Sequence, residues 1–217
     1  METLYSILCR STLLFEGLAL LAALITLPKY SKTILLLFLP FLTYVFVTEV
    51  LGSTVFTCSN QLLYNPELLM ENGVYLLSFM YVFKSKLLIQ ISRIILIVFV
   101  VVTLTDIYFL ESFSKEILSV SFNVGRILIL IEYFLYLFVL LQSNEYLELS
   151  RNLFFWLSTG IFIFILLTFL RDTLLGLEAD LSVNEKYVIK MSGFVASNIL
   201  YSCFIAGFLR CKKMTHV

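Results

Sequence analysis

The chain has 217 residues, of which 60% are hydrophobic and 14% are charged, and its formal net charge is zero. Soluble domains carry about 25% charged residues, so this composition predicts an integral membrane protein. A neutral chain offers no basic surface for nucleic acid, and we expect no nucleic-acid partner. The single histidine, His216, and four cysteines without C-x-x-C spacing argue against a zinc site or a His-based catalytic centre, so we expect no metal and no cofactor.

Apolar stretches in the first half of the chain predict four membrane-spanning helices. Pro28 is expected to end the first helix, and Pro40 to kink the second. Asn65, Pro66 and Glu67 are typical of a helix start, with an asparagine cap, a proline in the first turn and an acid at the positive end of the helix dipole. The four helices are expected at about residues 5–27 or 10–27, 33–51, 66–83 and 88–110.

Three further helices are expected in the second half, at about residues 117–142, 152–170 and 187–209. Each has the length of about 20 residues that a helix needs to cross the hydrocarbon core. The sequence therefore predicts an all-α fold, a polytopic seven-transmembrane-helix bundle that forms a single membrane domain over residues 1–217. The first apolar run lacks a basic n-region and contains Glu16, so we interpret it as the first membrane helix and not as a signal peptide.

Lysines and arginines in the connections predict the orientation of the bundle. One side carries nine of them and the other side four, and the larger number marks the cytoplasmic side. The N-terminus is therefore expected outside and the C-terminus in the cytoplasm. The nine are Lys29, Lys32, Lys84, Lys86, Arg93, Arg151, Arg210, Lys212 and Lys213, and the four are Arg10, Lys115, Arg171 and Lys186.

Ionisable residues inside the predicted spans gather at one depth. With this orientation they lie in the outer half of the membrane, on six helices, except for Glu132 just past the midplane. Because charges in hydrocarbon are costly, this pattern predicts a polar cavity that opens outward, or a buried ion-pair network beneath the outer surface. Asn198 joins them from a small, polar surface of the last helix. The candidate ligand- or ion-binding residues are Arg126, Glu132, Glu16, Glu49, Glu71, Asp106, Lys190 and Asn198.

Arg126 and Glu132 lie near the middle of the same predicted helix. They are six residues apart, so they point about 120° away from each other and each needs a partner from another helix. Arg126 is either a structural cation or a cation that binds an anionic ligand group. As a structural cation it would pair with Glu16, Glu49 or Asp106. Glu132 is either a neutral, hydrogen-bonded acid or a proton-linked switch or ion ligand.

The other candidates have their own alternatives. Asp106 and Glu49 lie near helix ends, where a solvated interfacial location is expected. Residues 71–73 form either a frayed helix start or the mouth of the cavity. Lys190 lies one turn into the last helix, whereas the retinal lysine of microbial rhodopsins is near mid-helix, so the sequence argues against an opsin.

Four segments resemble a group of small, uncharacterised bacterial seven-helix integral membrane proteins that are often encoded beside sensor kinases. The resemblance implies a multi-pass protein of the bacterial cytoplasmic membrane with a role in signalling. It brings no catalytic motif. The segments are FVTEVLG (46–52), LIEYFLY (130–136), NLFFWLSTGIFIFI (152–165) and SNILYSCFIAGFLRCKK (197–213).

We therefore expect a sensory or signal-transducing membrane protein, in which a ligand or ion enters the outward-facing polar cavity and moves the helices. The alternative is a small transporter or an oligomeric pore or channel subunit, with Glu132, Arg126 and Glu16 along the pathway. A membrane enzyme that uses paired carboxylates on a lipid is less expected, and no catalytic residue is assigned. The partners that fit this interpretation are the lipid bilayer, a cytoplasmic or membrane signalling protein, and further copies of the chain.

Overall fold

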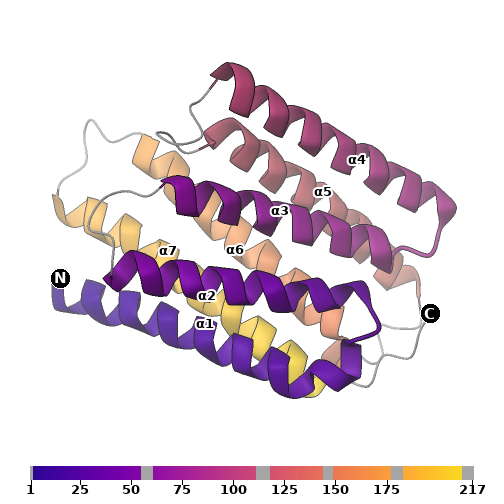
Figure 1. The fold of residues 1–217 in the computed structure, drawn as a ribbon, viewed down its shortest axis with the longest axis horizontal. Coiled ribbons are helices and arrows are strands. Elements are labelled where there is room, and N and C mark those ends of the chain that lie inside the picture. The colour runs from indigo at the N-terminus through magenta and orange to yellow at the C-terminus, as the bar shows by residue number, and fades with distance from the viewer. Residues whose placement is uncertain (1, 55–60, 111–117, 144–148, 177–182, 212–217) are drawn as a thin grey trace. The chain divides into compact units, whose positions relative to one another are not determined.

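A computed structural model describes residues 2–54, 61–110, 118–143, 149–176 and 183–211 of the chain (Figure 1). All the secondary-structure elements in these ranges are helical, which confirms the predicted all-α fold. Six of the helices are long and apolar enough to cross a membrane. The chain therefore has the helices of a multi-pass integral membrane protein.

The described helices form two compact units. The first unit contains α1 (Glu2–Tyr30), α6 (Leu153–Gly176) and α7 (Val183–Arg210). The second contains η1 (Ile34–Leu37), α2 (Phe38–Thr54), α3 (Gln61–Val82), α4 (Lys86–Thr105), η2 (Asp106–Leu110) and α5 (Ser119–Gln142). The expectation of a single domain over residues 1–217 stays a prediction.

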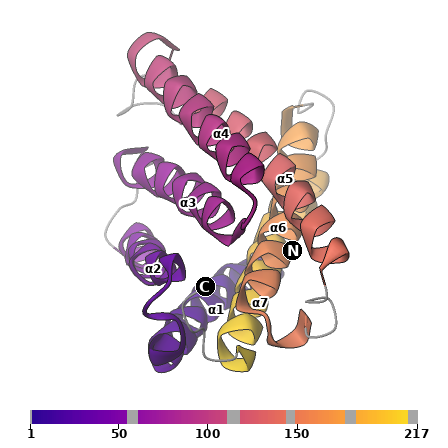
Figure 2. The ribbon, with the colours of Figure 1, turned by 90° about the vertical axis from the view of Figure 1, so that its right-hand side faces the viewer.

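In the first unit, α6 and α7 lie side by side along their length (Figure 2). Glycines allow this close approach. A Cβ atom added at Gly160 would lie 2.8 Å from the Cβ of Cys203, and one added at Gly207 would lie 2.8 Å from the Cβ of Trp156. Small residues at such contacts let two membrane helices pack backbone to backbone.

Aromatic and polar contacts attach α1 to α7 within the first unit. The ring of Tyr5 packs edge-on against Tyr187 and Phe194, with centroids 5.9 and 5.2 Å apart. Further along the helices, the Nδ2 of Asn198 donates to the Oγ of Ser11 at 2.8 Å. One predicted site residue, Asn198, therefore links two helices.

In the second unit, α3 lies between α2 and α4, and α5 packs against both α3 and α4 (Figures 1 and 2). Aromatic side chains fill the contact between α2 and α3, where the ring of Tyr75 lies 5.6 Å from Phe41 and 6.1 Å from Phe38. A second aromatic pair, Phe79 and Tyr136, joins α3 to α5 at 6.1 Å. The α3 helix is therefore the centre of this unit.

The helix that is not among the six apolar ones is α3. It carries Asn65, Glu67, Glu71 and Asn72 within two turns, and these polar side chains lower its hydropathy. Asn65 is 0% exposed and Asn72 is 2% exposed, so the polar side of the helix includes buried positions. The count of seven spans and the orientation of the termini stay predictions.

All three prolines lie elsewhere in their helices than the sequence predicts, and Pro66, expected in a first turn, lies inside α3. Pro28 lies inside α1, which ends at Tyr30, so the expectation that Pro28 ends the helix is wrong. Pro40 lies in the first turn of α2, directly after the 3₁₀ turn of η1, and not in a helix interior. A proline lacks a backbone N–H. In the first turn this costs no hydrogen bond, because the N–H groups there have no acceptor within the helix.

The predicted start of the third helix is also wrong. Asn65 lies inside α3, which begins at Gln61, and it is not an N-cap. Its Oδ1 instead accepts a hydrogen bond from the backbone N–H of Leu118, just before α5, at 3.2 Å. The side chain that resembles a local capping signal is used in a contact between helices.

Candidate functional site

Polar side chains of α5 are buried at three successive levels of the second unit. Ser121, Arg126 and Glu132 are 0%, 2% and 0% exposed. With a rise of about 1.5 Å per residue, the levels are about 7.5 and 9 Å apart along the helix. We call these residues and their partners from α3, α4 and η2 the polar column. The partners described below are Asp106, Glu71, Asn72, Tyr75 and Ser92.

At the first level, Asp106 binds the start of α5. One carboxylate oxygen accepts hydrogen bonds from the backbone N–H of Ser121 at 2.6 Å and from its hydroxyl group. Asp106 is 0% exposed, so the expectation of a solvated interfacial location is wrong. The physical reason is that the first N–H groups of a helix have no partner within it and its N-terminal end is positive, which favours a carboxylate there.

At the second level, Arg126 is held between α5 and α3. Its guanidinium carbon lies 3.6 Å from the centroid of the Phe122 ring, a cation–π contact within its own helix. Its charge acts on the carboxylate of Glu71 in α3. Glu71 is one of the predicted site residues, but the sequence did not indicate it as the partner of Arg126.

Beside this level, α3 and α5 approach each other closely at a glycine. A Cβ atom added at Gly125 would lie 2.7 Å from the Nδ2 of Asn72 and 3.1 Å from the ring of Phe99. Asn72 is 2% exposed, and its Nδ2 has no hydrogen-bond partner in the part of the chain that the structure describes. The absence of a side chain at Gly125 therefore makes room for an asparagine of α3 against α5.

At the third level, Glu132 faces α4. Its Oε2 accepts a hydrogen bond from the hydroxyl group of Ser92 at 3.0 Å. Its Oε1 is buried and has no hydrogen-bond partner among the described residues. A buried carboxyl oxygen without a partner is costly, so this atom is a place where a proton or a cation would bind favourably.

Four of the eight predicted site residues, Glu71, Asp106, Arg126 and Glu132, thus lie on α3, η2 and α5 of the second unit, and of these Arg126 acts on Glu71. Glu49 lies on α2 in the same unit and is partly exposed. In the first unit, Glu16 is 3% exposed on α1, and Lys190 is exposed on α7. Among the described residues no group of three or more His, Cys, Asp or Glu side chains is placed to hold a metal ion.

The sequence analysis missed the small polar partners of the column. Ser92 and Ser121 are serines within helices, and such residues usually bond to their own backbone. Tyr75 and Asn72 also lie on α3 near Glu71. The one signal in the sequence that could have identified Ser92 and Ser121 is their location on predicted spans, since buried acids such as Glu132 and Asp106 need a hydrogen-bond donor from a neighbouring span.

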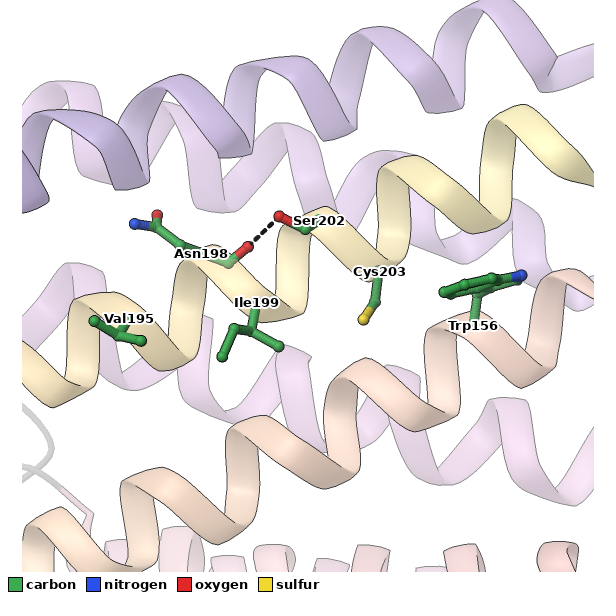
Figure 3. Close-up of a pocket in the computed structure, with 6 residues that line it drawn as sticks. All are labelled: Trp156, Val195, Asn198, Ile199, Ser202 and Cys203. Atoms are coloured by element: carbon green, nitrogen blue, oxygen red, sulfur yellow. Dashed lines mark hydrogen bonds between the residues drawn. The ribbon is translucent and has the colours of Figure 1, made fainter. Parts of the chain in front are cut away.

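A groove of about 330 Å³ lies on the surface of the α6–α7 pair in the first unit (Figure 3). Of the predicted site residues, Asn198 lines it. In the close-up, Ile199 and Cys203 point from α7 toward α6, whereas Asn198 and Ser202 point to the other side of α7. The full set of lining residues is Trp156, Val195, Asn198, Ile199, Ser202 and Cys203.

The fold and its six long apolar helices define a multi-pass helical membrane protein. Comparisons of the chain with protein-family models, with curated proteins and with solved structures found no match. The resemblance to small bacterial seven-helix proteins therefore stays a prediction. The arguments for function below depend on the geometry of the polar column.

Replacing Asp106 by alanine tests the first level of the column. We expect Asp106→Ala to lower the free energy of unfolding by about 1–3 kcal/mol, because the N–H and hydroxyl groups of Ser121 lose a buried acceptor. Asp106→Asn keeps an acceptor oxygen and should cost less. The control is Asp172→Ala, which removes a half-buried acid that pairs with the neighbouring Arg171 and should cost about 0–1 kcal/mol. Equal losses for the two alanine variants, measured by thermal unfolding in detergent, would contradict the prediction.

Proposed function

We propose that this chain is an integral membrane protein that transduces a signal through α3, α4 and α5, and that Glu132 is the group that senses a proton or a small cation. One observation carries the proposal. Glu132 is 0% exposed, one of its oxygens is bonded to Ser92, and its Oε1 has no partner among the described residues. Binding at Oε1 relieves the cost of that orphan atom and changes the contact between α4 and α5.

The column supports transmission of such a change to a second helix. Glu132 is attached to α4 through Ser92, and Arg126 interacts with Glu71 of α3. Both are on α5, six residues and about 9 Å apart along the axis. A movement of α5 at Glu132 therefore changes the geometry of the Arg126 contact with α3. Two links to two different helices make α5 the element whose position reports the occupancy of Glu132.

Seven spans are part of the proposal, with α3 as the seventh. Its position between α2 and α4 supports this count, since a helix enclosed by two spanning helices runs through the same depth. The lysine and arginine bias then favours an N-terminus outside and a C-terminus in the cytoplasm, and the resemblance of four segments to bacterial proteins favours a bacterial cytoplasmic membrane. The basic connections of the cytoplasmic side are where a signalling partner would bind.

A transporter or pore subunit is the second candidate. The observation that favours it is the succession of polar groups at three levels of α5, at Ser121, Arg126 and Glu132. Polar groups at successive depths are what an ion or proton needs along a membrane pathway. A transporter moves its substrate across the bilayer, whereas a signal transducer changes conformation without net flux.

Paired spin labels on α4 and α5 distinguish the two candidates. Labels are attached at Lys86→Cys and Gln142→Cys, two exposed positions of the second unit, in a background that lacks the native cysteines. In proteoliposomes, we expect acidification from neutral pH to change the distance between the labels. Glu132→Gln, which cannot ionise, should abolish the change. Glu49→Gln, the same substitution at a partly exposed position of α2, should leave it intact.

Proton flux is measured in the same vesicles. A distance change without flux supports signalling. Flux that Glu132→Gln abolishes overturns signalling in favour of transport. Neither a distance change nor flux overturns both candidates, and the column then has a structural role only.

A further inference from the structure

The groove on the α6–α7 pair has a lining suited to a hydrocarbon chain. Val195, Ile199 and Cys203 of α7 and the ring of Trp156 of α6 form its walls (Figure 3). All four lie within the two apolar stretches 153–173 and 187–210 that are long enough to cross a membrane. Its volume of about 330 Å³ is within the range of small-molecule sites, about 300–1,000 Å³. Val195 on its wall is 42% exposed, so the groove is accessible from the surface of the helix pair.

One end of the groove is marked by a cation. The guanidinium carbon of Arg210, the last residue of α7, lies 5.4 Å from the centroid of the Trp156 ring. The Nε1 of Trp156 donates to the backbone carbonyl of Ser150 at 3.1 Å, which fixes the orientation of the ring. Arg210 is exposed, and so is Arg151 in the chain segment next to this carbonyl. Both arginines are thus available at the end of the groove where the apolar stretches stop.

We propose that this groove binds one acyl chain of an anionic phospholipid, whose phosphate group is held by Arg210. The two parts of the site require the two parts of this ligand. A free anion would not fill the apolar groove, and a neutral lipid would not pair with the charge of Arg210. Arginine binds phosphate through several N–H donors, and a tryptophan at a span end is typical of the membrane interface. The inference goes beyond the function proposed above and does not depend on it.

Trp156 is the only tryptophan of the chain and lines the groove, so its fluorescence reports directly on this site. The protein is reconstituted in phosphatidylcholine vesicles that contain a small fraction of phospholipid with brominated acyl chains, which quench tryptophan at short range. Brominated phosphatidylglycerol and brominated phosphatidylcholine are compared at equal mole fractions. We expect about fivefold stronger quenching by the anionic lipid, the factor that one basic residue contributes at an anionic headgroup.

Two variants, each with a control, distinguish binding of the lipid headgroup from binding of the acyl chain. Arg210→Gln should make the two brominated lipids equal, whereas Arg93→Gln, at an exposed arginine of α4, should leave the preference intact. Ile199→Phe fills the groove and should reduce quenching by both lipids, whereas Val188→Phe, at an exposed position of α7, should not. Equal quenching by the two lipids in the unmodified protein would overturn the proposal. A preference that survives Arg210→Gln would overturn it as well.

Discussion

Arg126→Leu is expected to lower the free energy of unfolding by about 1–3 kcal/mol, because a charged side chain that is 2% exposed is removed and the partly exposed Glu71 loses a nearby cation. Here the carboxylate of Glu71 loses the cation that acts on it, and the Phe122 ring loses its cation–π contact. The measurement is unfolding by SDS in mixed micelles, followed by circular dichroism. Arg93→Leu, at an exposed arginine of α4, is the matched control and should cost little.

The identity of the acid is tested by a second substitution. Glu71→Gln combined with Arg126→Leu should recover a large part of the lost stability, since both charges are then absent. Recovery with Asp106→Asn, Glu16→Gln or Glu49→Gln in place of Glu71→Gln would assign the partner to one of the acids that the sequence indicated. If none of the four substitutions restores stability, the buried network does not hold the bundle together.

Two glycine-to-alanine substitutions are expected to have opposite signs. Gly160→Ala should lower stability by about 1–3 kcal/mol, because the new Cβ would lie 2.8 Å from the Cβ of Cys203 and 3.2 Å from the backbone oxygen of Leu200. Gly73→Ala adds the same methyl group to α3, where nothing lies within 4 Å. Since alanine favours a helix over glycine, it should raise stability by about 0.5–1 kcal/mol.

The same unfolding assay measures both variants, and Gly160→Ala/Gly73→Ala should give the sum of the two effects, because the residues belong to different units. A Gly160→Ala variant as stable as the unmodified protein would show that α6 and α7 do not pack as closely as described. Loss of stability in Gly73→Ala would place a neighbour against α3 that the structure does not give.

Most of the helices could be predicted from the sequence, because an apolar run of about 20 residues is a strong signal for a spanning helix. The ends were harder to predict. The Asn65 signal was misleading, since an asparagine that looks like a local cap is used by the backbone of Leu118, 53 residues away. Pro40 was misleading for a related reason. Its effect depends on whether the α-helix has begun, and the sequence does not show that a 3₁₀ turn precedes it.

For the candidate site, the sequence could indicate the need for partners but not their identity. The angle of about 120° between Arg126 and Glu132 required two different partner helices. The structure gives α3 and α4, through Glu71 and Ser92. Which helices lie beside α5 is a property of the packing, and a serine in an apolar stretch resembles many others. The location of Asp106 was predicted wrongly for the same reason, because Asp106 is buried against the first turn of α5, where it accepts a hydrogen bond from Ser121.

The two links of α5 to its neighbours also restrict how its sequence can change. The apolar residues between Arg126 and Glu132 can be exchanged for others of similar size without moving either link. The number of residues between them cannot change, because one added residue would turn Glu132 by about 100° and shift it by about 1.5 Å relative to Arg126. Glu132 would then face away from Ser92 while Arg126 stayed beside Glu71. The interval between these two side chains is therefore a fixed length in a helix whose individual apolar residues are otherwise replaceable.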